Sequence, residues 1–339
     1  MRNWDYRYCW LRDAALAASA LVKLGSTTEG MQFLDYVLGL LESAQSPERI
    51  QPLYTVTGGN LGPEAEIAEL SGYRGSRPVC VGNAAARQIQ LDVFGPIVQL
   101  LADLAEGDAP LSSQHWRITE AMVEAVERRW QEPDQGIWEI RHRRRHHVHS
   151  KVMCWATMDR AIAVEARFLD RRRPSWEALR GEIAEDLLDQ GYKPSVGAFT
   201  AAYDGDDLDA AALHVGLSGL LPPDDPRFVG TVEAVERHLR RGAAVFRYRC
   251  DDGLPGGEGA FHLCTAWLID AYVRVGRVND ARDLFSDMIV LTGATGVLSE
   301  QIDPRTGAAL GNTPQAYSHI GVIESALLLS RFDRPAAAP

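Results

Sequence analysis

Apolar residues recur at helical spacing along most of this 339-residue chain, and strand-like alternation is scarce. Start and stop signals delimit the helical segments, such as Gly25 after the first of them. We expect about eleven helices, near residues 12–24, 27–43, 82–105, 112–131, 150–169, 174–190, 207–219, 226–240, 258–275, 278–292 and 315–330. No linker or shift in composition separates them, so the pattern predicts one all-α domain over residues 1–335.

The connections between these helices alternate between short and long. The long ones are rich in Gly, Pro or charged residues and cover 44–81, 132–149, 191–206, 241–257 and 293–314. In a closed ring of paired helices such loops gather at one end, where a rigid scaffold presents functional side chains. No internal repeat of about 20 to 50 residues is visible, which favours a closed ring over a superhelical solenoid.

The charge and the cysteines exclude several classes of protein. The formal net charge of −11 argues against a nucleic-acid partner, which requires a basic footprint. No apolar run approaches the roughly 18 to 20 residues of a membrane span, and no leader is visible at Met1. The five cysteines are scattered without a CxxC pair (Cys9, Cys80, Cys154, Cys250 and Cys264). We therefore expect reduced thiols in a cytoplasmic protein.

The entry to the first predicted helix, WDYRYCWLRD, crowds aromatic side chains around an Arg–Asp pair, Arg12 and Asp13. One interpretation is a helix N-cap with its ion pair. The other is a sugar subsite, where Trp10 and Tyr6 stack on a pyranose and the charged pair binds its hydroxyls. The residues alone leave both open.

In GIWEI, a single carboxyl group, Glu139, stands between the bulky apolar residues Trp138 and Ile140. Partial burial would raise the pKa of Glu139, as a general acid near neutral pH requires. The alternative is a plain salt bridge to Arg141.

A second loop carboxylate, Glu300, follows a short apolar run and precedes the turn DPRTG. Two carboxyl groups that flank a glycosidic bond are what hydrolysis of a sugar requires. Together Glu139 and Glu300 therefore indicate glycoside chemistry.

The segment FRYRCDDGLPGGEG supplies a planar donor fork, Arg247, ahead of a glycine-rich loop. No strand pattern precedes it, so it is not a dinucleotide fingerprint. It also lacks the spacing of a helical metal-binding DDxxD motif, which argues against terpenoid chemistry.

The run RHRRRHHVHS packs four Arg and four His into residues 141–150. Its histidines lack a known ligand spacing and a cysteine partner, so we expect no metal site and no metal cofactor. We interpret the run as a solvated connector between Glu139 and the helix expected from Ser150.

Five stretches in this order resemble glycoside hydrolase family 15, in its bacterial branch of glucoamylases, glucodextranases and trehalases. They are RNWDYRYCWLRDAAL, YRGSRPVCVGNAA, GIWEIR with SKVMCWATMDRAI, RYRCDDGLPGGEGAFHLCTAWLIDAY and LSEQIDPRTGAALGNTPQAYSHIG. They run from residue 2 to about 330. The resemblance implies an (α/α)6 toroidal barrel of about six helix pairs.

The resemblance also implies roles. Glu139 matches the general acid and Glu300 the general base of an inverting mechanism, with carboxyl groups roughly 6.5–9.5 Å apart. The residues expected to bind substrate are Trp10, Arg12, Asp13, Trp138 and Arg247, with Tyr6, Glu258 and Gln301 as further lining residues. No cofactor is implied.

Bacterial members carry a β-sandwich domain ahead of the barrel, whereas this chain opens on the first barrel motif. We therefore expect the β-sandwich domain to be absent from this chain, and the partners expected beside a sugar are a second copy of the chain, in a homo-oligomer, or that missing β-sandwich domain. The leading function is a glucoamylase-like α-glucosidase that releases β-glucose from an oligosaccharide. The alternatives are a trehalase, which cleaves a disaccharide, and a carbohydrate-binding remnant without turnover.

Overall fold

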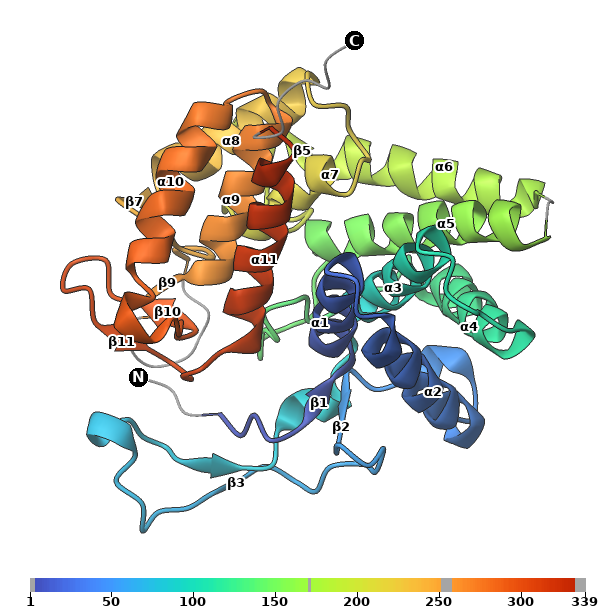
Figure 1. Cartoon of the computed structure of the whole chain (residues 1–339), viewed down its shortest axis with the longest axis horizontal. Helices are drawn as coiled ribbons and strands as arrows, with labels where there is room; N and C mark the ends of the chain where they lie inside the picture. The colour runs from blue at the N-terminus through green and yellow to red at the C-terminus, as the bar shows by residue number, and fades with distance from the viewer. Residues whose placement is uncertain (1–3, 170–171, 251–257, 333–339) are drawn as a thin grey trace. The chain divides into compact units, whose positions relative to one another are not determined.

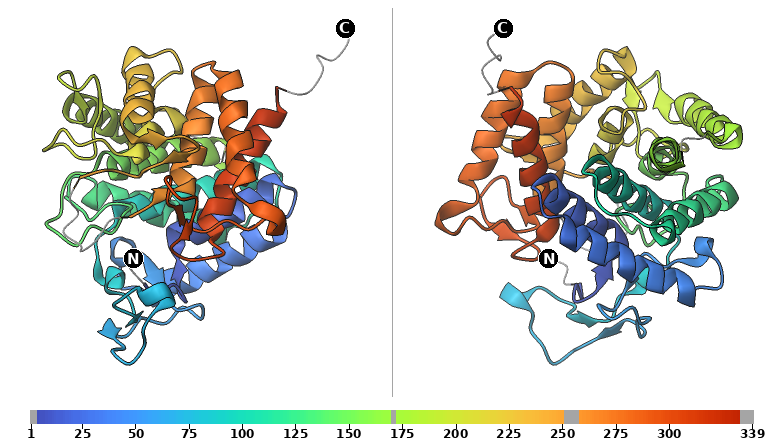
Figure 2. Two further views of the ribbon diagram at one scale, coloured as in Figure 1. Left: turned by 90° about the vertical axis from the view of Figure 1, so that its left-hand side faces the viewer. Right: turned by 45° about the vertical axis from the view of Figure 1, so that its right-hand side comes forward.

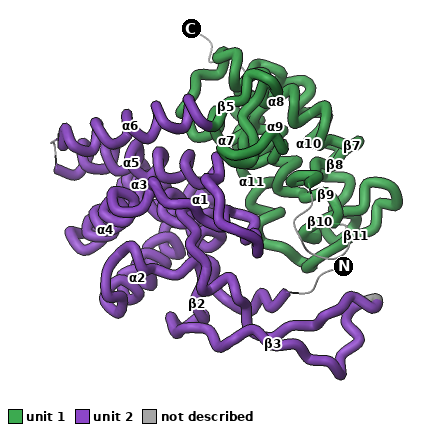
Figure 3. Tube along the Cα trace, turned by 180° about the vertical axis from the view of Figure 1, so that it is seen from behind, with its two compact units in different colours: residues 1, 191–339 green, residues 2–190 purple. Residues whose placement is uncertain are grey.

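The computed structural model describes residues 4–169, 172–250 and 258–332, and helices dominate it (Figure 1). The loop DDGLPGG lies outside the described residues. The chain divides into two compact units (Figure 3), here called the N-terminal unit, residues 2–190, and the C-terminal unit, residues 191–339. The expectation of one domain over residues 1–335 stays a prediction.

The N-terminal unit is built on α3, which contacts α1, α4 and α5, while α2 packs on α1 and α6 packs on α5. Nearly every residue of α3 is buried, as its almost continuous apolar sequence predicts. The bounds of the helices are α1 Leu11–Lys23, α2 Thr27–Ser43, α3 Phe94–Glu106, α4 Ser113–Arg129, α5 Val148–Leu169 and α6 Pro174–Gln190.

The C-terminal unit is built on α9, which contacts α8, α10 and α11 (Figures 1 and 2). Its helices are α7 His214–Leu217, α8 Pro226–Leu239, α9 His262–Arg274, α10 Val278–Val290 and α11 Ala316–Ser330. Asp225 caps α8 through a 2.9 Å bond from the Arg227 amide to its carboxylate, with Pro226 at the first helical position.

Short antiparallel strands pair within the loops of the C-terminal unit. One five-stranded sheet has the order β11-β10-β9-β8-β7, and in it Gln301 pairs with both Phe261 and Leu310. Its strands are β7 Arg240–Arg241, β8 Ala244–Val245, β9 Ala260–Phe261, β10 Gln301–Ile302 and β11 Ala309–Leu310. Glu300 therefore directly precedes β10, the strand between β11 and β9.

The other strands form three two-stranded ribbons. They are β1 Cys9–Trp10 with β2 Leu53–Tyr54, β3 Ala65–Glu66 with β4 Cys80–Val81, and β5 Tyr192–Lys193 with β6 Ala198–Phe199. The remaining single turns of 3-10 helix are η1 Pro47–Arg49, η2 Tyr73–Gly75, η3 Ala84–Arg87, η4 Leu91–Val93, η5 Ala210–Leu213 and η6 Gly293–Thr295.

The helix predicted from residue 82 is wrong over its first dozen residues, because α3 begins only at Phe94. The backbone upstream bonds to distant residues. Leu91 donates its amide to the Asp134 carboxylate at 3.0 Å, and Ile89 exchanges bonds with Gln135 at 2.8 and 2.9 Å. Residues 88–90 are therefore extended between η3 and η4.

Two further predicted helices are shorter in the structure. The segment 207–219 is η5 followed by the one-turn α7, since Asp209 caps η5 and Gly219 has φ +89°, which ends the turn. The helix predicted from residue 258 begins at His262 because β9 uses the two residues before it. Among the described helices, none is both long and apolar enough to cross a membrane.

Candidate active site

Glu139 ends a tight turn that starts at Gly136. Its amide donates to the Gly136 carbonyl at 3.1 Å, and Glu139 has φ +57°, a left-handed conformation that is uncommon for a residue with a side chain. Gly136 has no room for a Cβ, which would lie 2.9 Å from the His147 ring. Backbone strain of this kind clusters at functional sites.

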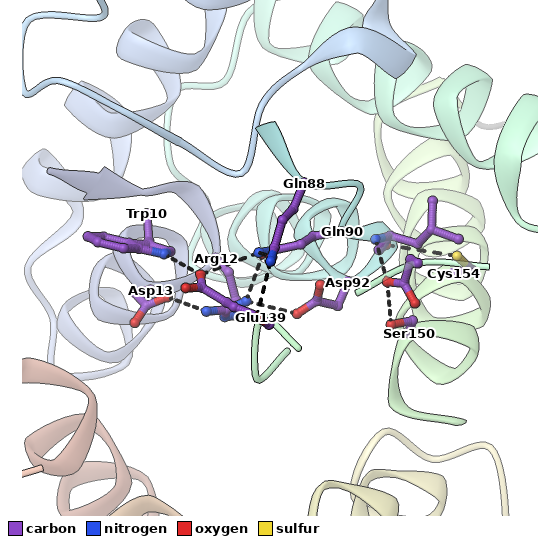
Figure 4. Close-up of polar contacts among 11 residues, drawn as sticks. Trp10, Arg12, Asp13, Gln88, Gln90, Asp92, Glu139, Ser150 and Cys154 are labelled. Atoms are coloured by element: carbon purple, nitrogen blue, oxygen red, sulfur yellow. Dashed lines mark hydrogen bonds and ion pairs between the residues drawn. The ribbon is translucent and has the colours of Figure 1, made fainter. Parts of the chain in front are cut away.

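Three donors hold Glu139 (Figure 4). The indole nitrogen of Trp10 donates to Oε1 at 2.6 Å, and the amide of Gln90 donates to the same oxygen at 3.3 Å. Gln88 donates to the backbone carbonyl of Glu139 at 3.1 Å. Within the segment 88–90, Gln90 therefore holds the side chain of Glu139 and Gln88 holds its strained backbone.

The pKa of Glu139 is raised, because burial disfavours the carboxylate more than its surroundings stabilise it. The positive charge of Arg12 and the bonds from Trp10 and Gln90 act in the opposite direction. A carboxyl group in this setting keeps its proton closer to neutral pH, as a general acid must. The salt bridge to Arg141 that the sequence left open is wrong, since Arg141 pairs bidentately with Glu64 at 2.7 Å.

Arg12 is held between two carboxylates. It donates to Asp92, which is fully buried, at 3.0 Å, and lies 3.2 Å from Asp13, whose side chain is 31% exposed. Burial raises the pKa of Asp13, and Arg12 opposes that rise. Asp13 occupies the first turn of α1 while Trp10 is the N-cap, so the N-cap interpretation of Asp13 is wrong. Its predicted role in binding substrate stays a prediction.

The predicted aromatic residues gather at the start of α1. Tyr6 and Trp10 have ring centroids 5.4 Å apart, and Trp10 packs with Leu53 and Ala85 in a small core cluster. Trp138 is half-buried in the Glu139 turn.

A second buried carboxyl group, Asp134, lies behind the turn. Its Oδ2 accepts from Ser150 at 2.7 Å as well as from the Leu91 amide. Burial, with the nearby Asp92, raises the pKa of Asp134 to about 7. The sequence interpretation missed this residue.

The basic run is a solvated connector only in its first half. Arg143 and Arg144 are exposed, but Val148, His149 and Ser150 are buried where α5 begins, two residues before the predicted start. Burial lowers the pKa of His149 to about 3, so that ring is neutral. Among the described residues, no group of three or more His, Cys, Asp or Glu is arranged to hold a metal ion.

In the C-terminal unit, Glu300 is fixed through its backbone: its amide donates to the Asn312 carbonyl at 2.8 Å, and its carbonyl accepts from His262 at 3.3 Å. Gly311, at φ +70°, approaches its side chain so closely that a Cβ there would lie 2.4 Å from Oε2. A larger residue at this position would force the Glu300 side chain to move.

Arg247 forms an ion pair with Glu258, and its guanidinium lies 4.9 Å from the ring centroid of Phe261. Gln301 is buried, and its side-chain oxygen accepts from the Gly259 amide at 2.8 Å. The structure thus gives Gln301 a contact that holds the loop, while its predicted role as a lining residue stays a prediction.

The residues that sequence reasoning missed are Gln88, Gln90, Asp92, Asp134 and Gly311. A signal for three of them was present, because polar residues alternate in QIQLD. Alternation with period two places Gln88 and Gln90 on one side of an extended segment. The prediction of a single helix over residues 82–105 overlooked this alternation.

Residues 2–327 match the glycosyl hydrolases family 15. The trehalase of Mycobacterium tuberculosis (strain ATCC 25618 / H37Rv) is 38% identical over 99% of this chain and 50% of its own length. The trehalase of Thermoplasma acidophilum (strain ATCC 25905 / DSM 1728 / JCM 9062 / NBRC 15155 / AMRC-C165) is 37% identical over 96% of this chain and 56% of its own length. The chain belongs to glycoside hydrolase family 15, and it spans about half the length of the curated relatives it matches.

Solved structures agree on the fold. A wild-type glycosidase superposes with a TM-score of 0.76 at 20% identity, covering 96% of this chain and 88% of that one. A bacterial glucoamylase complexed with acarbose gives a TM-score of 0.68 at 14% identity, covering 96% of this chain and 51% of that one. These likenesses confirm the predicted fold class, an all-α fold of the (α/α)6 barrel type.

Proposed function

We propose that this chain is the catalytic part of an inverting glycoside hydrolase that cleaves trehalose, with Glu139 as general acid and Glu300 as general base. The observation that carries the chemistry is the environment of Glu139: a half-buried carboxyl group with a raised pKa, held by two donors in a turn with left-handed backbone. Trehalose is favoured as substrate because curated trehalases are 36–38% identical over nearly all of the chain.

The two carboxyl groups divide the reaction. Glu139 gives its proton to the glycosidic oxygen as the bond from C1 to that oxygen breaks. Glu300 takes a proton from a water whose oxygen bonds to C1 from the opposite face. Trehalose and water yield one β-glucose and one α-glucose, and each carboxyl group returns to its starting state when the proton is passed back through solvent.

The remaining predicted residues bind glucose in this proposal. Asp13 accepts hydroxyl hydrogens and Arg12 keeps its carboxylate in place, while Arg247 presents a planar fork of donors. Trp10, Tyr6 and Trp138 supply aromatic surface for the apolar face of the sugar ring.

The glucoamylase-like function, which was the leading expectation from the sequence, ranks second to trehalose cleavage. The solved glucoamylases are only 14% identical to this chain and support the fold alone. The binding-remnant alternative is weakened because both Glu139 and Glu300 are present.

Glucose release from trehalose, maltose and maltotriose tests the proposal. We expect turnover of trehalose above the two maltosaccharides, and NMR of the first products should show α- and β-glucose in equal amounts. Glu139→Gln and Glu300→Gln should each lower kcat by about 100-fold or more. Glu127→Gln, at an exposed position on α4, is the control.

Other outcomes separate the alternatives. Faster turnover of maltotriose than of trehalose establishes the glucoamylase-like function instead. Sugar binding without turnover in both the parent and Glu139→Gln identifies a binding remnant. A carboxyl separation outside roughly 6.5–9.5 Å in a crystal structure contradicts the inverting pair.

A further inference from the structure

The Gln90 side chain lies between the Arg12 guanidinium and the Glu139 carboxyl group. Its Oε1 accepts from Arg12 Nη1 at 3.3 Å, and its Nε2 donates to Glu139 Oε1 at 3.3 Å and to Gln88 Oε1 at 3.0 Å. The side chain is 5% exposed, so water does not replace these partners easily. Figure 4 shows Gln90 beside Glu139 and the Arg12 guanidinium.

The chemistry of these partners fixes the orientation of the Gln90 amide. A guanidinium can only donate, so the amide oxygen must face Arg12. The amide nitrogen then faces Glu139 and the Gln88 oxygen, both of which accept. A flipped amide would set NH₂ against the guanidinium and oxygen against oxygen, which loses all three bonds.

We propose that Gln90 is a positioning residue that directs the acidic proton of Glu139 to Oε2. This inference rests on the proposed function, since it concerns how Glu139 works as an acid. Gln90 and Trp10 both donate to Oε1, which makes Oε1 the carbonyl-like oxygen of the protonated carboxyl group. The hydrogen therefore resides on Oε2, to which no described residue donates in the structure.

Gln90 also acts as a neutral spacer. Arg12 already acts on Glu139 through its charge, which favours the carboxylate. A direct ion pair would hold Glu139 ionised and remove its proton at working pH. The amide satisfies one guanidinium donor without adding charge, and Asp92 takes the second bond at Nη1.

Gln90→Leu tests the inference with two substrates that need the acid to different degrees. Trehalose has a sugar leaving group that must be protonated, whereas fluoride leaves α-glucosyl fluoride with far less need of a proton. We expect kcat on trehalose to fall by about 10- to 100-fold, because a misplaced catalytic group costs that much. We expect kcat on α-glucosyl fluoride to fall by less than about threefold.

Gln99→Leu is the matched control. Gln99 lies in α3 of the same unit and bonds to Asp103 at 2.7 Å and Arg160 at 2.7 Å, so the substitution removes similar amide bonds away from Glu139. It should change neither rate. Equal losses of Gln90→Leu on both substrates show a merely structural role and overturn the inference, as does an unchanged rate on trehalose.

Gln90→Glu keeps the volume and the acceptor for Arg12 but turns an acceptor toward Glu139. We expect the same selective loss on trehalose, together with an alkaline limb of kcat/KM that moves up by roughly one pH unit, because the new charge disfavours the Glu139 carboxylate. This variant should fold if Gln90→Leu does not. An unshifted alkaline limb contradicts the inference.

Glu139→Gln separates the inference from the function on which it rests. If Glu139→Gln retains full activity on trehalose, the assignment of the acid fails and the inference fails with it. If Glu139→Gln loses trehalose turnover selectively while both Gln90 variants behave like the parent, only the inference fails.

Discussion

The indole nitrogen of Trp10 lies 2.6 Å from Oε1 of Glu139 and joins two residues 129 positions apart in the sequence. The first is the N-cap of α1, and the second ends a turn ahead of α5. This bond makes the first motif of the chain part of the environment of Glu139.

Trp10→Phe should raise the pKa of Glu139, since it removes a donor that favours the carboxylate while it keeps most of the ring. A hydrogen bond to a charged group contributes about 1.5–3 kcal/mol, so we expect the alkaline limb of kcat/KM to move up by about one to two units. The pH profile on trehalose measures this shift. Trp116→Phe, at a ring that stacks on Trp176, should leave the profile unchanged; a shift in the acidic limb alone contradicts the assignment.

Gly311→Ala should displace the carboxylate of Glu300, because the added Cβ would lie 2.4 Å from Oε2. A displacement of about 1 Å costs roughly 100-fold in kcat. The natural control is Gly307→Ala. Gly307 has nearly the same φ, +71°, but nothing lies within 4 Å of its Cβ position. Equal losses in the two variants would mean that backbone strain, and not the contact with Glu300, is responsible.

Asp134→Asn should change how stability depends on pH. The pKa of Asp134 is raised to about 7 in the folded protein, so the folded state binds the extra proton between about pH 4 and 7. Its contribution to the free energy of unfolding is therefore full below pH 4 and is lost as pH rises through 7.

The amide has no proton to lose, so Asp134→Asn should gain stability over the parent as pH rises from 5 to 8, by up to a few kcal/mol. Urea unfolding at several pH values measures the difference. Asp5→Asn is the control, because Arg7 lowers the pKa of Asp5 and the sign of its contribution is opposite. A difference between Asp134→Asn and the parent that is constant with pH would count against a raised pKa.

Arg247→Lys should raise KM for trehalose by about tenfold with a smaller effect on kcat. A lysine presents a point charge where the guanidinium forms a planar fork over Phe261. Initial rates over a range of trehalose concentrations separate the two constants. Arg241→Lys, at an exposed position in β7, should leave kcat and KM unchanged. An unaltered KM in Arg247→Lys would show that Arg247 does not bind the substrate.

Helices could be predicted from the sequence wherever local signals decide them. The end of α1 follows from Gly25, which has φ +97° and donates to the Val22 carbonyl, and the start of α8 follows from Asp225 and Pro226. Residues 82–93 could not be predicted in this way. The amides of Ile89 and Leu91 bond to Gln135 and Asp134, more than 40 residues away, and no local propensity encodes such partners.

For the site, the motif identified Glu139 but not what surrounds it. Neither the left-handed backbone of Glu139 nor the donors from Trp10 and Gln90 follow from the letters GIWEI. For Asp13 the sequence allowed a helix N-cap with its ion pair, and the structure has the ion pair with Arg12 at 3.2 Å but makes Trp10 the N-cap.

The left-handed backbone at Glu139 has a consequence for the stability of the folded protein. A residue with a Cβ in that conformation costs on the order of 1 kcal/mol, which glycine avoids. Glu139→Gly would relieve this strain, but it would also leave the Trp10 indole and the Gln90 amide without their shared acceptor, at a cost of about 1–3 kcal/mol for each unpaired donor. The donors that place the carboxyl group thus also offset the strain of its backbone, and a laboratory selection for thermal survival alone would not discard Glu139.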